Sequence, residues 1–202
     1  MLQDYHRDWL DTPSEHGITI KKAVCLDGRV PTLVVNPLLP FGKRGLVVRE
    51  QLVERGVTIP SEKFLKKDIC QHTVVFLHGR NGRKEDLLAV AERFCAVGLR
   101  CLLIDLPAHG ESSLETVRFG ASEWEQDIPY KVLLECAEKY HFSPEEASLW
   151  GMSMGGSFVN SALADREHGS HWKSAVVVCS FDQLDEVVKG KCRSEWLTGI
   201  IS

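Results

Sequence analysis

Short runs of mostly apolar residues recur along the last two-thirds of the chain, each bounded by polar residues or glycine. Runs of this length are shorter than a typical helix. A continuous apolar run is typical of a parallel strand that is covered on both faces. We therefore predict four buried strands, at residues 73–77, 100–104, 147–150 and 175–179.

Between the predicted strands, apolar residues recur at helical spacing. In the first interval they are Leu87, Leu88, Ala91, Phe94 and Cys95. Gly98 then ends this predicted helix. In the second interval, Ser122 with Glu125 has the spacing of a capping box, and Pro129 either kinks or restarts the helix. A third helical run covers 157–164. The alternation predicts an α/β protein with a mostly parallel sheet, flanking helices and right-handed crossovers.

The N-terminal part of the chain follows a different pattern. Residues 1–17 are polar, and we expect an irregular surface strap without a function of its own. Residues 18–26 and 29–36 are rich in Val, Ile and Thr and are joined by Asp27-Gly28, a dipeptide that suits a tight turn. These two segments predict an antiparallel hairpin.

The segment 37–70 contains several prolines and reads as a connection. Only residues 46–52 form an amphipathic run that suits a short helix. A chain of 202 residues is long enough for one sizeable core, so we expect a single domain over 1–202. Residues 189–202 then read as the start of a segment that is cut short.

Composition narrows the class of protein. Apolar residues make up 44% and charged residues 26% of the chain, and the net charge is −4 at pH 7, which gives no reason to expect nucleic acid or an anionic membrane as a partner. The seven cysteines form no C-x-x-C pair, so we expect reduced thiols and a cytoplasmic protein. We find neither a signal-peptide pattern nor an apolar stretch long enough to span a membrane.

The sequence shows no metal-ligand spacing, and residues 79–84 lack the G-x-x-x-x-G-K-[ST] frame of a phosphate-binding loop. We therefore expect no cofactor and no metal. Small neutral substrates remain compatible with the composition.

The most specific motif lies after the strand predicted at 147–150. Gly151, Ser153 and Gly155 form G-x-S-x-G between an apolar strand and a helical run. This pattern is typical of a sharp strand-to-helix turn that exposes a nucleophilic serine, because flanking glycines let the backbone segments pass closely. The alternative is a plain glycine-rich turn in a Rossmann-like sheet.

Two other strand ends carry polar residues. His78-Gly79 follows the strand at 73–77, and residues 105–112 follow the strand at 100–104 with the pattern Asp105-x-x-x-His109-Gly-x-Ser. The carboxyl ends of parallel strands face one ligand crevice, so we expect these residues near Ser153.

These three features, in this order, resemble the α/β-hydrolase family over residues 18–188. The resemblance implies a serine hydrolase in which Ser153 attacks a carboxylic ester or thioester and forms an acyl-enzyme. It also implies an oxyanion hole made by the backbone N–H groups of Arg80 and Met154, with His78 and Gly79 shaping the substrate-binding loop. The implied partner is a small-molecule ester or acyl substrate.

The resemblance is incomplete at the C-terminal edge of the fold. In this family the acid and the histidine of the triad follow the serine, commonly after the seventh and eighth strands, whereas this chain shows strands only up to the sixth. Asp182 is the candidate acid and His109 the candidate base, although His109 also suits a loop-packing role and Asp105 suits a brace for its loop. The remaining placeable histidines precede strands and are expected at the opposite edge of the sheet; they are His72, His141, His168 and His171.

Two alternatives therefore remain beside the hydrolase. One is a non-catalytic protein with this fold, and the other is an acyltransferase that uses the same serine. The strand at 175–179 is apolar throughout and would form an open edge, at which we expect self-association.

Overall fold

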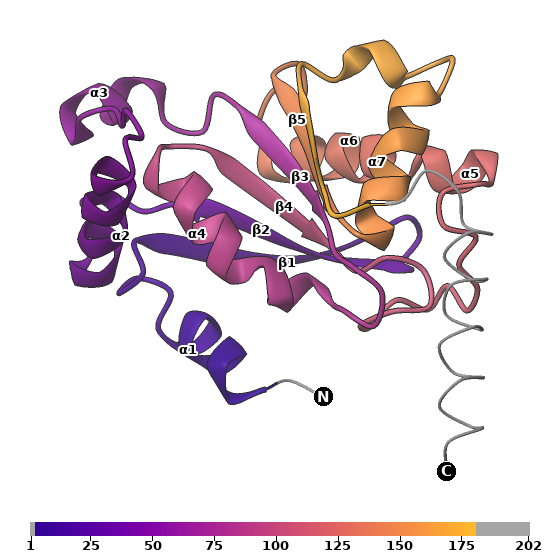
Figure 1. Ribbon diagram of the computed structural model, residues 1–202, viewed down its shortest axis with the longest axis horizontal. Helices are drawn as coiled ribbons and strands as arrows, with labels where there is room; N and C mark the ends of the chain where they lie inside the picture. Colours follow the sequence, from indigo (N-terminus) through magenta and orange to yellow (C-terminus); the bar gives the residue numbers. More distant parts are fainter. Residues whose placement is uncertain (1–2, 181–202) are drawn as a thin grey trace, which may run out of the picture.

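The computed structural model describes residues 3–180 as a twisted sheet with helices packed on both faces (Figure 1). Within these residues the strand order is β1-β2-β4-β3-β5-β6. The strands are β1 (Ile18–Cys25), β2 (Val30–Pro37), β3 (Thr73–Leu77), β4 (Arg100–Ile104), β5 (Ala147–Met152) and β6 (Ala175–Val178). Strands β4, β3, β5 and β6 are parallel, whereas β1 and β2 pair antiparallel and β2 joins β4 antiparallel. The sequence prediction of a mostly parallel sheet with an N-terminal hairpin is confirmed.

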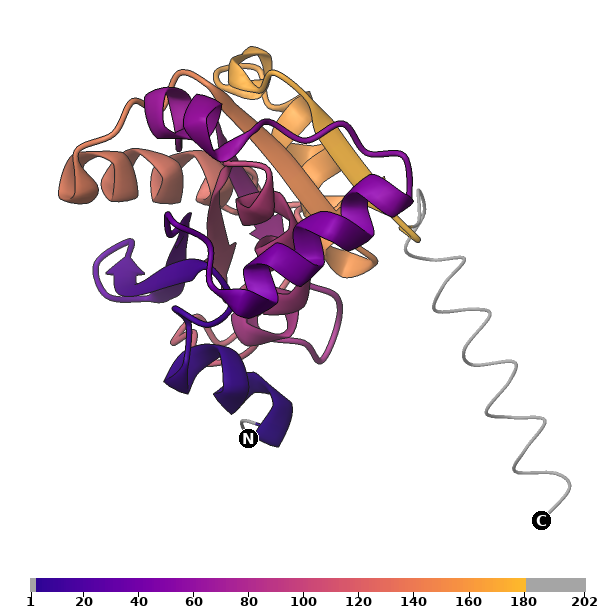
Figure 2. The same cartoon turned by 90° about the vertical axis from the view of Figure 1, so that its left-hand side faces the viewer.

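Two short 3-10 helices and seven α-helices connect the described strands. They are α1 (Asp4–Asp11), α2 (Lys43–Glu54), α3 (Glu62–Asp68), η1 (Lys84–Leu87), α4 (Leu88–Ala96), α5 (Glu123–Gln126), α6 (Ile128–Tyr140), α7 (Met154–Ala164) and η2 (Gly169–His171). In the turned view of Figure 2, α2 runs across the front of the molecule. None of the helices within residues 3–180 is long and apolar enough to cross a membrane.

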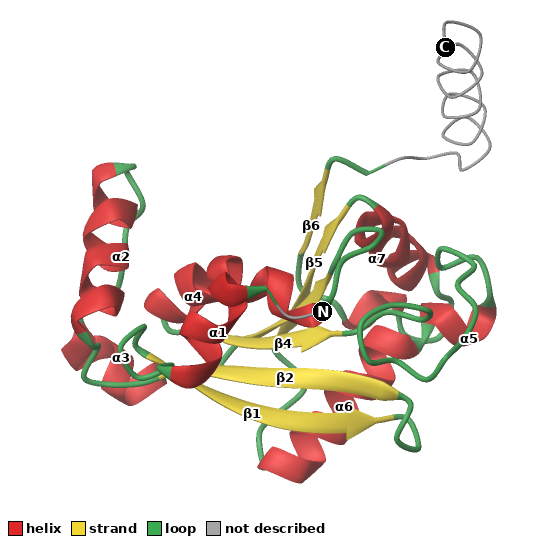
Figure 3. Cartoon of the chain, turned by 90° about the horizontal axis from the view of Figure 1, so that it is seen from below, coloured by secondary structure: helices red, strands yellow, loops and turns green. Residues whose placement is uncertain are grey.

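Alternate residues of the central strands build the two halves of the core. Val75 and Leu77 face the cluster formed with α6 and α7, whereas Val74 and Phe76 face the cluster formed with α4. In Figure 3, α1 and α4 lie on one side of β1, β2 and β4, and α6 lies on the other. Each fully buried Leu or Phe contributes about 1.5–3 kcal/mol, so the double covering explains why the apolar runs have no polar face.

The strand register brings the predicted site residues to one edge of the sheet. Leu77, the last residue of β3, pairs with Ile104 on one side and with Gly151 on the other. The segments that follow β3, β4 and β5 therefore start at the same level. One of them begins with His78, one with Asp105 and one leads to Ser153.

The hairpin turn is a confirmed prediction. Leu26, Asp27 and Gly28 have φ angles of 53°, 55° and 80°. Gly28 adopts such an angle without steric cost, and Asp tolerates it better than most residues. Ladder pairing resumes at once on the far side of the turn, where Cys25 pairs with Val30.

The prediction of an irregular strap at residues 1–17 is wrong for the segment that forms α1. His6 is only 1% exposed, and its Nε2 lies 2.7 Å from Asp86 Oδ1 in the segment before α4. Helix α1 is therefore stabilised by a tertiary contact across 80 positions of sequence. Local composition could not reveal that contact, because single-sequence patterns report mainly on nearby residues.

The connection at residues 37–70 contains more helix than the sequence indicated. Helix α2 extends beyond the predicted 46–52 run at both ends, and α3 was not predicted. The Ser61 hydroxyl accepts a hydrogen bond from Phe64 N and caps α3. The pair Ser61-Glu62 is the local sequence signal for this helix start.

The predicted capping box at Ser122 does not form. Ser122 precedes α5 but makes no side-chain cap, and Glu125 instead accepts the backbone N–H groups of Arg118 and Gly120 at 2.7 and 2.9 Å. The preceding loop needs those acceptors because its own N–H groups are buried or partly buried. Pro129 restarts the chain as α6, one of the two outcomes predicted for it.

Strand β6 ends one residue earlier than predicted, and it is not buried on both faces within the described structure. Val176 and Val177 are 46% and 41% exposed. Among residues 3–180, β6 pairs with β5 alone, so apolar residues occupy an edge position.

Candidate active site

Ser153 lies on a sharp turn between β5 and α7. Its backbone has φ 52° and ψ −116°, a conformation that residues other than glycine rarely adopt and that costs of the order of 1–3 kcal/mol. Three hydrogen bonds hold the turn: Ser153 N donates to Val178 O, and Ser153 O accepts from Gly156 N and from the Ser180 hydroxyl, each at 2.9 Å. The strained residue is thus fixed by the strand beside it and by the helix after it.

The glycines of G-x-S-x-G are required by close backbone packing. A Cβ atom on Gly151 would lie well inside 3.0 Å of Gly155 O, and one on Gly155 would lie equally close to Leu77 O. Real Cβ atoms essentially never approach so closely. The start of α7 can therefore rest against the end of β3 only with glycine at position 155, and against the end of β5 only with glycine at position 151. This is the close passage of backbone segments that the sequence pattern indicated.

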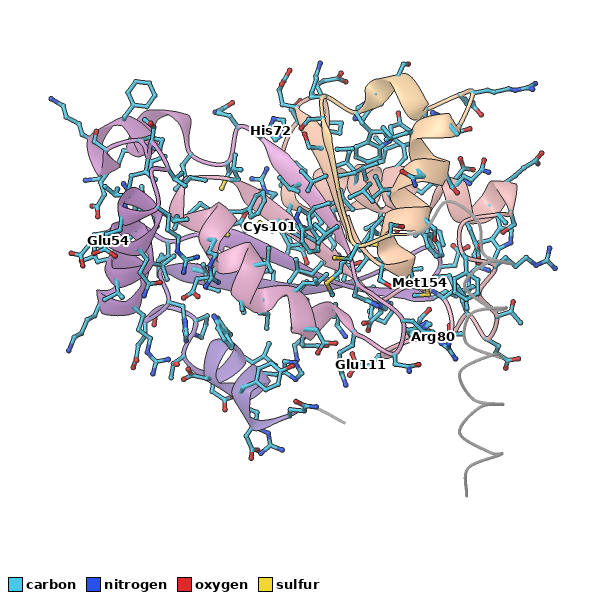
Figure 4. The ribbon with its side chains drawn as sticks, in the orientation of Figure 1. Glu54, His72, Arg80, Cys101, Glu111 and Met154 are labelled. Carbon is cyan, nitrogen blue, oxygen red and sulfur yellow. The ribbon has the colours of Figure 1, made fainter. Side chains whose placement is uncertain are left out.

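The loop after β3 lies directly beside the serine. A Cβ atom built on Gly79 would lie 3.5 Å from Ser153 Cβ, an ordinary van der Waals separation. The Arg80 side chain is exposed, whereas Met154 is buried. Figure 4 shows Arg80, Met154 and Glu111 in one region of the molecule, with His72 well away from them.

His78 orients the peptide between Gly79 and Arg80. Its Nε2 accepts a hydrogen bond from Leu106 N at 3.0 Å, so the ring proton is on Nδ1, which donates to Gly79 O at 2.8 Å. Gly82 N donates to the same carbonyl at 3.1 Å. Because a trans peptide is planar, fixing this carbonyl also fixes the Arg80 N–H on the opposite side.

The protonation state of His78 is part of this arrangement. The side chain is 1% exposed, and burial is the main cause that lowers its pKa. A neutral ring is also what the contacts require, since a protonated Nε2 could not accept from Leu106 N.

A buried carboxylate links the loops after β3 and β4. Asp105 is fully buried and accepts hydrogen bonds from Lys84 N at 2.8 Å, Lys84 Nζ at 2.7 Å and Glu111 N at 2.9 Å. Lys84 Nζ also contacts Glu111 at 2.7 Å and Glu85 at 3.0 Å. Asp105 therefore braces its own loop, as its position indicated. It also holds Lys84, which follows the serine-facing loop, the loop after β3 at residues 78–82.

The ammonium group of Lys84 remains charged in this environment. Burial acts to lower the pKa of Lys84, but hydrogen bonds to Asp105 and Glu111 outweigh it and raise the pKa. Lys84 was not among the predicted site residues. A single lysine in a loop carries no local signal, and its partner Asp105 is 21 positions away.

The predicted base and acid are not brought to Ser153 by any contact described for residues 3–180. His109 Nδ1 donates to Pro107 O at 2.8 Å, and its ring centre lies 5.4 Å from that of His78. Asp182 lies outside the described residues. Of the histidines assigned to the opposite edge, His72 contacts the Ser148 hydroxyl at 2.8 Å, near the amino end of β5.

One group of side chains in the described structure has metal-ligand chemistry. Ligand atoms of Asp127, Asp165 and His168 lie within 4.8 Å of one another. Lys131 Nζ already pairs with Asp127, and the backbone N–H of His168 already donates to Asp165. Both carboxylates thus already have protein partners, and the group adjoins the start of α6 and the end of α7 rather than Ser153.

No protein-family model matches the chain. It is 28% identical over 120 residues to the quorum-quenching protein AidA of Acinetobacter baumannii, an alignment that covers 56% of this chain and 37% of that protein.

Solved structures share the arrangement of strands and helices. A puromycin-hydrolyzing peptidase of Mycobacterium tuberculosis has a TM-score of 0.54 at 15% identity, covering 84% of this chain and 23% of that one. An esterase of Pyrococcus furiosus has a TM-score of 0.52 at 16% identity, covering 78% and 51%. The chain thus spans about half or less of the length of these proteins.

Proposed function

We propose that this chain, which has the α/β-hydrolase fold, acts through Ser153 as the nucleophile of a serine hydrolase on a carboxylic ester or thioester. The observation that carries the proposal is the strained turn at Ser153 lying directly against Gly79. A strained serine that is braced on both sides is the geometry that a nucleophile needs to stand clear of the sheet.

In this proposal Ser153 Oγ attacks the substrate carbonyl, the ester or thioester bond breaks, and the alcohol or thiol leaves with a proton, so that an acyl-enzyme remains. The negative charge that develops on the carbonyl oxygen is stabilised by the N–H groups of Arg80 and Met154, each worth about 3 kcal/mol of transition-state stabilisation. Met154 is the first residue of α7, so its N–H lies at the positive end of the helix dipole. His78 and Gly79 support the first donor by fixing the peptide before Arg80.

Proton transfer in this proposal is assigned to His109, with Asp182 as the acid. His109 lies on the loop after β4, where Nδ1 donates to Pro107 O and leaves Nε2 available as the base. In this proposal Asp182 takes the place of Pro107 O as the acceptor of the Nδ1–H. The assignment places a base on the same edge of the sheet as the nucleophile. Water then releases the acyl group from Ser153.

A fluorophosphonate probe tests the nucleophile directly. Intact-mass and peptide analysis should locate the label on Ser153, and Ser153→Ala should abolish it. The matched control is Ser157→Ala on the same helix, because the Ser157 hydroxyl donates to Met154 O and is not placed on the strained turn. Arg80→Ala should change the labelling rate by less than about tenfold, since its role uses the backbone.

Absence of label on the wild-type chain, or label that persists in Ser153→Ala, would contradict the proposal. Hydrolysis of a short-chain p-nitrophenyl ester gives a second readout. Because the Acinetobacter relative is a quorum-quenching protein, quorum quenching is a third readout to measure with the same variants.

A further inference from the structure

Two cysteines that are far apart in sequence touch in the core. Cys25 is the last residue of β1 and Cys136 lies on α6, 111 positions later. Their sulfur atoms are 3.7 Å apart, and the side chains are in the same buried cluster at 3% and 0% exposure. No disulfide joins the hairpin to α6 in the described structure, where six cysteines are free.

We propose that Cys25 and Cys136 form a modification site, at which hydrogen peroxide converts the two thiols into an intramolecular disulfide. The sulfur atoms would have to approach by about 1.7 Å to reach the usual bond length of about 2.05 Å, which is within the range of side-chain rotation combined with a small shift of α6.

The contact between the two sulfur atoms shifts the pKa values of the two thiols in opposite directions. The hydrogen bond from Cys136 is the main cause that lowers the pKa of Cys25, and the same bond raises the pKa of Cys136. Cys25 is therefore the thiol that loses its proton more readily and reacts first with peroxide, and Cys136 is the thiol that resolves the product.

The chain offers an internal comparison in Cys95 and Cys101. Their sulfur atoms are 3.9 Å apart, but each thiol also donates to a backbone carbonyl, Cys95 to Val35 O and Cys101 to Ala91 O. Burial raises the pKa of Cys95 well above its usual value. The Cys95 thiol is therefore held in the protonated form, and this pair should react much more slowly.

The hairpin turn next to Cys25 lies near the surface. Asp27 is exposed in this turn, and Leu26 N donates to Glu135 Oε2 at 2.9 Å. This bond and the bond from Tyr140 OH to Lys22 O join the hairpin to α6, and in this proposal peroxide reaches the Cys25 sulfur when the turn opens locally.

The reaction balances with peroxide as the oxidant. Cys25 loses its proton and attacks one peroxide oxygen, the O–O bond breaks, and the hydroxide that leaves takes up this proton as water, so that Cys25 becomes a sulfenic acid. The Cys136 sulfur then attacks the Cys25 sulfur and displaces the second water. The two thiols lose two protons and two electrons in total, and the peroxide accepts the two protons and the two electrons to give two waters.

The disulfide would tie the β1–β2 hairpin to α6. The same hairpin contacts the loop after β4, because Arg29 O accepts from the Ser112 hydroxyl at 3.1 Å and from Ser113 N at 3.3 Å. A cross-link that closes a loop of this length restricts the unfolded chain, and we expect it to raise Tm by several degrees.

The test uses the full chain carrying Cys179→Ser and Cys192→Ser, which removes the exposed Cys179 thiol and a thiol outside the described residues. After peroxide treatment under native conditions, intact mass should show the loss of two hydrogens, reversed by dithiothreitol. Non-reducing peptide mapping should give at least about tenfold more cross-link between Cys25 and Cys136 than between Cys95 and Cys101.

Cys136→Ser should abolish the cross-link and leave a sulfenic acid on Cys25 that dimedone traps. The double variant Cys95→Ser/Cys101→Ser should keep the cross-link, and circular dichroism checks that both variants are folded. A dominant link between Cys95 and Cys101, or oxygen addition at Cys25 in the folded parent without any cross-link, would overturn the proposal.

Discussion

The loops after β3 and β4 and the outer edge of β6 belong to one sheet but are stabilised in different ways. In the loops, every carboxylate oxygen of Asp105 has a partner, and Lys84 lies at 3% exposure among three acidic side chains. At the edge, Val176 and Val177 are exposed and their strand has one neighbour within the described residues.

The comparison shows what each region needs in order to keep its geometry. In the loops, the partners of the His78 ring and of the Asp105 carboxylate all lie within residues 78–111, so both side chains are held by contacts inside the described structure. Within the described residues, the outer side of β6 presents apolar side chains and no partner strand, which are the features that invite another strand. The β3 and β4 side of the site is thus held by buried polar contacts, whereas the β6 side is not.

The largest effect should come from removing the cation between the loops. Lys84→Met leaves Asp105 and Glu85 without their ammonium partner, and breaking a buried ion pair in this way costs about 3–5 kcal/mol. Urea unfolding measures the loss. The matched control is Lys131→Met, whose exposed pair with Asp127 should contribute less than about 1 kcal/mol. Equal losses in the two variants would show that the buried network does not hold the loops.

An intermediate effect should appear as acid sensitivity of the serine-facing loop. The pKa of His78 is lowered in the folded chain, mainly by burial, so the unfolded chain binds this proton at a higher pH. Between the ordinary histidine pKa of about 6.5 and the lower folded value, the unfolded state holds more protons. Stability should therefore be complete above that window and fall as the pH falls through it.

His78→Gln keeps a hydrogen-bond donor and acceptor but cannot titrate in this range. The free energy of unfolding of this variant should depend less on pH between 7.5 and about 5 than that of the wild-type chain. Urea titrations at several pH values give both slopes. Identical slopes would mean that His78 is not held neutral in the folded state.

The smallest effect on stability is expected at the edge. We propose that β6 mediates self-association, and Val176→Lys should weaken it while changing the free energy of unfolding by less than about 1 kcal/mol, since the side chain is 46% exposed. Sedimentation velocity over a range of concentrations measures the association.

The matched control for the edge is Val24→Lys on β1. Val24 is 54% exposed on a strand at the opposite edge, which already carries the exposed Lys21 and Lys22. Lysines of this kind protect an edge strand, so the control should leave association unchanged. A similar response of both variants, or a monomeric wild-type chain, would contradict a special role for β6.

The sequence by itself determined the parts of this protein that depend on local spacing. The apolar runs at 73–77 and 100–104 coincide with β3 and β4, and Asp27-Gly28 lies in the hairpin turn. The glycines around Ser153 were interpretable for the same reason, because backbone crowding at a strand-to-helix turn acts on adjacent residues.

The tertiary structure decided which distant groups meet. Helix α1 depends on the contact of His6 with Asp86, and the brace between the loops depends on Lys84 meeting Asp105. The charge of Lys84 or Asp105 gives no indication of its partner, since a salt bridge has no local period and many surface positions carry the same residue types. The sequence therefore predicts where strands end and where a serine is exposed, whereas only the folded chain shows which buried charges hold that serine's surroundings in place.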